Sequence, residues 1–437
     1  MVRARMAPEV LSRRVGRHVR YISLVALTGG EIANSASGKG GRVAETGTAP
    51  ARARVAPLYA AGFVTAFGAH GVAAGIGAGG EDIGLSLLRI GILIALYDVA
   101  EVILKPVFGS LADRIGAKPV IVGGLIGFAA LSLIGLAAPN PIALAVARLG
   151  QGAAAAAFSP AASATVARLA GTGRTGRYFG RYGSWKSLGY AAGPLLGAGL
   201  IAIGGMPLLF AGLSVLAAAT AVWVLIALPS VPPLPRPRYT VLDLIRQTTD
   251  RTFLVPTVAL ASSTAVLGAA IGFLPALAGQ DGSDLFASVA IASVLALSST
   301  LVQPRVGAIR DAGTVSDRVG TVIGLAVIAA GVLLTAIFPH TLALYAAAIL
   351  IGVGIGITTP FAFASLADAT PPERMGRTMG SAELGREVGD TVGPLLVGAV
   401  ATAATLPLGL AALGALTLGA AAYVGSSGAR TARGPSR

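Results

Sequence analysis

The stretch Leu96–Gly109, LYDVAEVILKPVFG, holds three ionisable side chains inside a run that is otherwise apolar. In a helix Lys105 lies one turn beyond Glu101, so the ammonium group and the carboxylate can pair. Asp98 lies one turn before Glu101, near the middle of the run. Removal from water disfavours the charged form of a carboxylate, and a second acid nearby disfavours it further. We therefore expect a carboxylate to exchange a proton within an apolar segment, with Asp98 as the first candidate and Glu101 as the second.

A second charged set lies in another apolar segment near the C-terminus. It consists of Glu383, Arg386, Glu387 and Asp390. Metal chemistry is not indicated, because the three histidines (His18, His70 and His340) are scattered without metal-binding spacing and the chain has no cysteine. We expect no metal and no cofactor.

The elements that carry these charges are expected to be membrane-spanning helices. Of the 437 residues, 54% are hydrophobic and 12% charged, against roughly 25% charged in soluble proteins. Many apolar blocks are about 20 residues long, enough to cross a hydrocarbon layer about 30 Å thick, and they lack the alternation of barrel strands. We predict an all-α polytopic membrane protein with twelve transmembrane helices. Their ranges are 55–79, 86–108, 119–138, 142–166, 183–203, 206–228, 253–278, 286–306, 320–338, 341–366, 379–403 and 406–426.

The twelve spans divide into two six-helix bundles, over residues 55–228 and 252–426. The proline-rich and then charged segment 229–251 is expected to be a cytoplasmic linker between them. Residues 1–54 are basic and rich in Gly, Ala and Ser, and are expected to form a disordered cytoplasmic tail. The alternative is that this segment comes from an over-long start site. Residues 427–437 form a second cytoplasmic tail.

The two halves repeat one another, which predicts two pseudo-symmetric bundles. GRYFGRYGSWKSLGYAAGPLLGA (176–198) aligns with GRTMGSAELGREVGDTVGPLLVGA (376–399) at an offset of 200 residues. At an offset of 198, Pro106, Gly109 and Asp113 recur as Pro304, Gly307 and Asp311. Six helices repeated in one orientation are typical of transporters, in which one half rocks against the other about a central site.

Lysine and arginine gather in alternate loops, which predicts the orientation of the chain. These residues are Arg114, Lys118, Arg168, Arg174, Arg177, Arg181, Arg236, Arg238, Arg246, Arg251, Arg310, Arg318, Arg374 and Arg377. The opposite loops hold only Arg89. By the positive-inside rule both termini are cytoplasmic. This asymmetry accounts for the net charge of +14 without a nucleic-acid partner.

The loop after the second span, GSLADRIGAK (109–118), resembles the G-x-x-x-D-R-x-G-R-K motif of the major facilitator superfamily, apart from Ala117 in place of a basic residue. The matching residues are Gly109, Asp113, Arg114, Gly116 and Lys118. Glycines permit a tight turn. We expect Asp113 to cap a helix end or to pair with a cation of the other bundle, and Arg114 and Lys118 to hold the loop on the cytoplasmic side.

The fourth span, ALAVARLGQGAAAAAF (143–158), resembles a second motif of the family, R-x-x-Q-G, at Arg148, Gln151 and Gly152. An arginine inside a span costs roughly 2.5–3.5 kcal/mol, so it needs a carboxylate, a cavity or a substrate. The resemblance implies a role for Arg148 in proton coupling. The alternative is that its side chain reaches the nearby outer surface of the membrane.

The fifth span, GYAAGPLLGA (189–198), resembles a third motif, G-x-x-x-G-P-x-x-G-G, with Ala198 replacing the last glycine. The matching residues are Gly189, Gly193, Pro194 and Gly197. Small residues let helices approach closely, and proline kinks a helix. In the family this motif marks antiporters, chiefly drug exporters, so the resemblance implies export. A partial echo in the eleventh span leaves a purely structural role open.

In this family helices 2 and 11 face each other between the halves, so the resemblance implies that the two charged sets meet. We expect Lys105 and Arg386 to pair with acids of the opposite bundle when the inner gate is shut. The alternative is that all these charges are static ion pairs. The first span lacks the acid that some family exporters carry there, and this places proton exchange on Asp98.

The resemblance also implies a central cavity walled by helices 1, 4, 7 and 10, whose residues are mostly apolar. Such walls suit loosely specified organic compounds better than sugars, because each sugar hydroxyl needs a partner. Candidate lining residues are Phe63, Phe67, His70, Gln151, Phe158, Phe273, Phe361 and Phe363. The alternative is that the phenylalanines pack against lipid or other helices and that His70 is a structural histidine.

The resemblance implies a secondary transporter, not an enzyme, that exports small hydrophobic or amphipathic compounds in exchange for protons. Its expected partners are a small-molecule substrate, protons and the lipid bilayer of the cell membrane, and it is expected to work as a monomer. The first alternative is a proton symporter that takes up an organic nutrient. An intramembrane aspartyl protease needs G-x-G-D at its second acid, where position 387 is Glu. No loop forms the ligand domain of a receptor or the selectivity filter of a channel.

Overall fold

The computed structural model describes residues 51–79, 87–137, 140–171, 173–230, 249–280 and 285–427. Most of the expected N-terminal tail (1–50), most of the expected linker (231–248) and most of the expected C-terminal tail (428–437) lie outside the described residues. The domain boundaries therefore remain predictions. The first helix of the described residues, α2, begins at Ala51, slightly before the expected start at 55.

The described residues form long helices, two short 3₁₀ turns and no strand. In the first half these are α2 (Ala51–Gly79), α3 (Leu87–Ile115), α4 (Ala117–Ile134), η2 (Gly135–Ala137), α5 (Pro141–Ala170) and α6 (Thr175–Ala227). In the second half they are α8 (Arg251–Gln280), α9 (Leu285–Asp311), α10 (Asp317–Ile337), α11 (Thr341–Ala369), η3 (Pro372–Arg374), α12 (Met375–Ala403) and α13 (Leu406–Ser426). Because α6 contains two helices, the prediction of twelve helices is confirmed.

The break inside α6 lies at two glycines between the fifth and sixth expected spans. Gly204 and Gly205 have non-helical backbone angles, and φ of Gly205 is 71°. This left-handed conformation is one that residues with a side chain rarely adopt. The chain can therefore turn back between segments 175–203 and 206–227 without a longer loop.

Several helices begin where the sequence offers a side-chain cap. The Asn140 carboxamide accepts a hydrogen bond from the backbone N–H of Ile142 at 2.9 Å, and Pro141 occupies the first position of α5. Ser316 and Thr405 accept from the backbone N–H groups of Val319 and Leu408 at the starts of α10 and α13. These oxygens bind N–H groups that have no partner within the helix.

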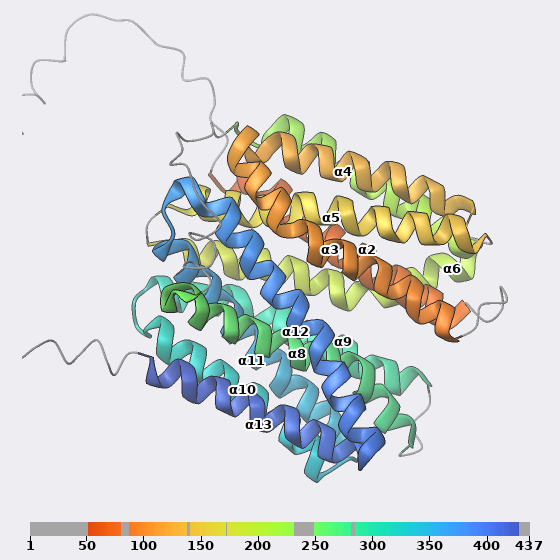
Figure 1. Ribbon diagram of the computed structural model, residues 1–437, viewed down its shortest axis with the longest axis vertical. Coiled ribbons are helices and arrows are strands. Elements are labelled where there is room, and N and C mark those ends of the chain that lie inside the picture. The colour runs from red at the N-terminus through yellow and green to blue at the C-terminus, as the bar shows by residue number, and fades with distance from the viewer. Residues whose placement is uncertain are drawn as a thin grey trace, which may run out of the picture. The chain divides into compact units, whose positions relative to one another are not determined.

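The helices gather into two bundles, each with a buried core (Figure 1). In the first bundle α2 packs on α6, and α5 packs on α3 and α4; in the second, α8 packs on α12, and α11 packs on α9 and α10. The bundles meet chiefly where α3 contacts α12 and where α6 contacts α9. These four elements carry most of the charges that lie within the bundles, so the interface between the bundles is where the site must be sought.

Apolar side chains cover much of the exposed surface. Ile203, Ile226 and Leu342 are each at least 77% exposed, and soluble monomers rarely expose apolar surface so widely. Eight helical spans of the described residues are long and apolar enough to cross a membrane. They belong to α2, α4, α5, the second segment of α6, α8, α10, α11 and α13.

The segment 109–118 is less of a loop than the sequence suggested. α3 continues to Ile115, α4 begins at Ala117, and the intervening Gly116 has φ 94°. The single turn residue is therefore Gly116. Gly109 lies within α3, where a Cβ would lie 2.6 Å from the carbonyl oxygen of Gly376, so its role is close packing of α3 on α12 and not a turn.

Candidate functional site

A buried ammonium group lies at the contact of α3 and α12. Lys105 is 0% exposed, and its Nζ lies 2.8 Å from Glu101 Oε2 and 2.5 Å from Glu387 Oε1. Glu101 belongs to the same helix, whereas Glu387 belongs to the other bundle. Lys105 therefore forms both predicted pairs, one with Glu101 of its own span and one with Glu387 of the other bundle.

Next to this group lies a cavity lined by four acids, which we call the acidic cavity. Its ionisable lining residues are Asp98, Glu101, Glu387, Asp390, His70, Lys186, Tyr97 and Tyr190. The Asp98 and Asp390 carboxylates form no hydrogen bond or ion pair with any residue that the structure describes. Asp98 therefore faces the space between the bundles and not the lipid.

A second group of charges connects side chains of α5 and α6 with α12 of the other bundle. Glu383 is 0% exposed and lies 3.1 Å from Lys186 Nζ, across the interface, while the Ser163 hydroxyl donates to it at 3.2 Å. Arg386 Nη1 lies 3.6 Å from the same carboxylate. Arg386 was expected to pair with an acid of the opposite bundle, and this is wrong. Its acid is Glu383, which lies one turn earlier on the same helix and is therefore within reach, and Lys186 of the other bundle binds the same carboxylate.

Lys186 was not among the expected site residues, yet a signal for it exists in the repeat. At the offset of 200 residues Lys186 aligns with Arg386. Both cations line a cavity that we call the cationic cavity. Its walls are Phe179, Tyr182, Gly183, Lys186, Ser187, Tyr190, Leu267, Gln303, Ile355, Thr359, Phe363 and Arg386.

The motif residues of the fourth span are buried and packed against α3. Arg148 is 1% exposed, its guanidinium lies 4.5 Å from the centre of the Tyr97 ring, and Nη1 donates to the Gly68 carbonyl at 3.4 Å. It is thus enclosed and does not extend to the outer membrane surface. A Cβ on Gly152 would overlap the backbone carbonyl of Tyr97. Gln151 donates to Ser132 at 2.9 Å and lines neither cavity.

Asp113 joins the bundles at the end that carries the arginine-rich loops, which we call the arginine-rich end. Its carboxylate accepts hydrogen bonds from the backbone N–H groups of Gly376 and Arg377, both at 2.9 Å, at the start of α12. Arg168 of α5 lies 3.2 Å away. Asp113 thus caps a helix of the other bundle and also binds a cation. Arg114 is exposed and Lys118 half-exposed at the same end.

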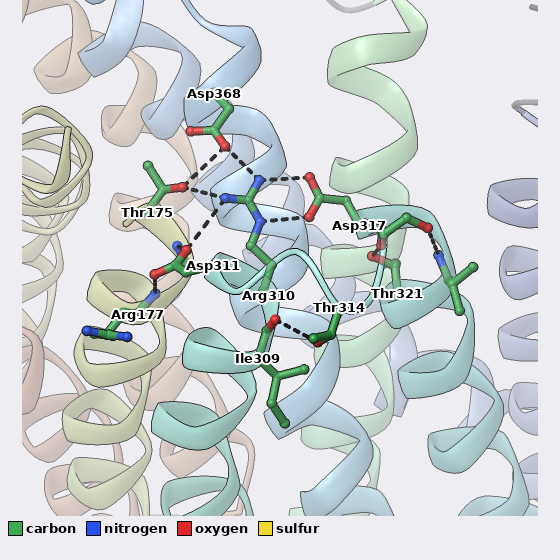
Figure 2. A network of polar contacts seen from close by, with 12 residues as sticks. Thr175, Arg177, Ile309, Arg310, Asp311, Thr314, Asp317, Thr321 and Asp368 are labelled. Carbon is green, nitrogen blue, oxygen red and sulfur yellow. Dashed lines mark hydrogen bonds and ion pairs between the residues drawn. The ribbon is translucent and has the colours of Figure 1, made fainter. Parts of the chain in front are cut away.

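Asp311 makes the matching contact in the second half (Figure 2). It accepts from the backbone N–H groups of Gly176 and Arg177, at 2.8 and 2.7 Å, at the start of α6. The neighbouring Arg310 donates to Asp317 and Asp368. Burial alone would lower the pKa of Arg310, but these hydrogen bonds outweigh burial and raise it. Two carboxylates, each capping a helix of the opposite bundle, therefore join the bundles at the arginine-rich end.

The glycines of the fifth-span motif pack α6 against α2. A Cβ on Gly189 would lie 2.7 Å from the Phe63 carbonyl oxygen, and one on Gly197 would lie 3.0 Å from that of Gly71. Gly193 also contacts Gly71, and Pro194 lies within α6. Gly389 and Gly393 pack α12 against α8 in the same way. The motif therefore has a packing role in both halves.

Most of the phenylalanines expected in a cavity lie elsewhere. Phe158 and Phe361 are at most 2% exposed within the bundle cores, and Phe63 stacks on Phe67 with ring centres 5.7 Å apart. Phe273 packs against the core of the second bundle. None of these five lines either cavity, whereas Phe363 lines the cationic cavity and His70 the acidic one.

Comparison with known proteins links this architecture to one family. A family model described as Major Facilitator Superfamily matches residues 58–394 and 312–433. The chain is 37% identical over 107 residues to the tetracycline resistance protein, class G, of Vibrio anguillarum, covering 24% of the chain and 27% of that protein. It is 38% identical over 122 residues to the puromycin resistance protein pur8 of Streptomyces alboniger, covering 28% and 24%.

The quinolone resistance protein NorA of Staphylococcus aureus is 28% identical over 133 residues, covering 30% of the chain and 34% of that protein. The matched segments thus span about a quarter to a third of these relatives. Among solved structures, the human organic anion transporter MFSD10 (TETRAN) aligns with a TM-score of 0.71 and 18% identity, over 86% of this chain and 100% of that one. A variant of the E.coli fucose:proton symporter FucP aligns with a TM-score of 0.67 and 14% identity, over 85% and 97%. At these identities the structural likeness shows the fold alone.

Proposed function

Because the chain belongs to the major facilitator superfamily, we propose that it exports small hydrophobic or amphipathic compounds from the cell in exchange for protons. The family makes it a multi-pass membrane transporter and not an enzyme. Export over uptake is supported by the relatives whose names record resistance to tetracycline, puromycin and quinolones. The predicted family and fold are confirmed by these comparisons.

One observation carries the proton part of the proposal. The Asp98 carboxylate lines the acidic cavity between the bundles, and no described residue pairs with it. A carboxylate that is paired with a cation is stabilised in its charged form and takes up a proton less readily. Lys105 is such a cation for Glu101 and Glu387. An unpaired carboxylate within the membrane is able to alternate between its charged and neutral forms.

The arrangement of contacts supports transport by alternating access. Asp113 and Asp311 close the arginine-rich end, and opening this end requires each to release the helix that it caps. The two bundles would then rock about the cavities between them. By the positive-inside rule this end faces the cytoplasm, together with both termini. We place the protein in the cell membrane, working as a monomer.

The direct test is transport in inside-out membrane vesicles that hold the full-length chain and have an acidified lumen. We expect tetracycline, puromycin or a quinolone to be taken up into the lumen while protons leave it, and nigericin, which collapses the proton gradient, to stop the uptake. Vesicles from cells without the chain provide the control. Substrate uptake that is indifferent to nigericin would disprove proton exchange, and movement of substrate and protons in the same direction would establish symport.

The closed arginine-rich end provides a test of alternating access. Asp113→Asn keeps the shape of the side chain but removes its charge, and hydrogen bonds to a charged group contribute about 1.5–3 kcal/mol. A loss of about 1.4 kcal/mol changes a population about tenfold. We therefore expect the open form of this end to become about ten times more populated.

The readout uses a single cysteine, which is simple because the chain has none. Met379 lies on α12 and is 0% exposed, so Met379→Cys reports opening through its rate of labelling by a water-soluble thiol reagent. Asp250→Asn is the matched control, because this exposed carboxylate contacts the first turn of its own helix. An equal labelling rate with and without Asp113→Asn would show that this contact does not hold the end closed.

A further inference from the structure

We propose that the cationic cavity binds the anionic group of the transported compound, so that the substrates are aromatic organic anions such as carboxylates or sulfonates. This inference rests on the proposed transport function and names the substrate class. Lys186 and Arg386 are 4% and 8% exposed, and both line the cavity. They occupy equivalent positions of the two repeats, so the two bundles contribute one cation each.

Arg386 has a buried hydrogen-bond donor that no described residue uses. Arg386 lies 3.6 Å from Glu383, which is too far for a hydrogen bond, and its buried Nε has no partner among the described residues. Gln303, which lines the same cavity, donates from Nε2 to Ser187 and Ser299 at 2.8 and 2.9 Å. A planar guanidinium with free donors matches a carboxylate or sulfonate, which accepts two hydrogen bonds at once.

The distribution of acids separates this cavity from the acidic one. Asp98, Glu101, Glu387 and Asp390 all line the acidic cavity, whereas none of the described residues that line the cationic cavity is an acid. Glu383 lies behind the two cations, where Ser163 also binds it. The charged residues that line the cationic cavity are thus both cations, and this favours an anionic group there.

The other walls indicate an aromatic body for the substrate. Phe179 stacks on Phe363 with ring centres 5.3 Å apart, and the Arg386 guanidinium lies 5.7 Å from the centre of the Phe363 ring. Aromatic faces next to a cation suit a flat ring that carries the anionic group. Lys186 and Tyr190 line both cavities, so the anion would bind next to the acids that exchange protons.

The test compares three probes of the same shape and different charge: 2-naphthoate, 2-naphthamide and 2-naphthamidinium. Equilibrium dialysis against the purified full-length chain in detergent gives a Kd for each. We expect 2-naphthoate to bind at least about tenfold more tightly than the other two, because a charge-assisted hydrogen bond is roughly twice as strong as a neutral one. Arg386→Gln is expected to remove this preference.

The controls separate a binding role from a structural one. Arg305→Gln removes an exposed cation of α9 and is expected to keep the preference. Arg386→Lys keeps the positive charge and is expected to keep the preference for the anion with a several-fold weaker Kd, which tests the site if the glutamine variant does not fold. Equal binding of the three probes, or unchanged 2-naphthoate binding in Arg386→Gln, would overturn the proposal.

The same probes distinguish this inference from the transport proposal. Arg386-dependent binding of 2-naphthoate without proton-driven export would support the site and disprove the proposed function. Proton-driven export of neutral or cationic compounds, with no binding of 2-naphthoate, would disprove the site and leave the proposed function in place.

Discussion

Replacing Asp98 by Asn is expected to abolish accumulation driven by a proton gradient while leaving the protein folded. One pH unit is equivalent to about 1.4 kcal/mol for each proton. A gradient of about two pH units can therefore sustain about a 100-fold substrate ratio when one proton is exchanged. Asn has nearly the shape of Asp but cannot titrate, so we expect this ratio to fall to about 1. No described residue pairs with Asp98, so the substitution leaves no charged partner behind.

The measurement is substrate accumulation in proteoliposomes with and without an imposed pH gradient. Substrate counterflow, the exchange of labelled for unlabelled substrate without a gradient, is expected to persist in Asp98→Asn, because it needs no net proton movement. Asp390→Asn is the matched variant, since Asp390 lines the same cavity and is also unpaired among the described residues. Full gradient-driven accumulation in Asp98→Asn would remove Asp98 from the proton pathway, and loss only in Asp390→Asn would move the role to that residue.

The helices and their order follow from the sequence because each depends on local information. Length and apolarity define the spans, and Asn140 and Thr405 mark helix starts by the side-chain caps they form. The repeat at offsets of 200 and 198 residues relates Gly176 to Gly376 and Asp113 to Asp311. The structure shows that these pairs also make equivalent contacts. Asp113 binds the backbone N–H of Gly376 at the start of α12, and Asp311 binds that of Gly176 at the start of α6.

The cavities do not follow from the sequence in the same way. A phenylalanine in a span carries no signal of whether it faces a core, the lipid or a cavity, and Phe158 and Phe361 face cores. Pairing between helices is also not local. Arg386 pairs within α12, with Glu383 one turn earlier, and Lys186 of the other bundle binds the same carboxylate. Only the alignment of Lys186 with Arg386 in the repeat indicated that position.

Lys105→Met is expected to destabilise the protein more than any other change considered. The ammonium group of Lys105 neutralises Glu101 and Glu387, which approach it from opposite bundles. Removing one partner of a buried ion pair costs about 3–5 kcal/mol, because it leaves a charge unpaired in a medium of low polarity. Here two carboxylates lose their partner at once. We expect a marked fall in the temperature at which the full-length chain loses its fold in detergent.

Lys118→Met is the matched control, because Lys118 is half-exposed on α4 and surface changes usually stay within about 0.5 kcal/mol. If unpaired charges cause the loss of stability, then removing the two carboxylate charges as well must restore it. Combining Lys105→Met with Glu101→Gln and Glu387→Gln removes all three charges, and neutral replacement of a buried ion group is often neutral or stabilising. The triple variant is therefore expected to recover most of the lost stability, yet the contact between α3 and α12 would no longer depend on charge. If the single and triple variants are equally unstable, then Lys105 stabilises the fold through its packing, and the ion pairs between the bundles contribute little.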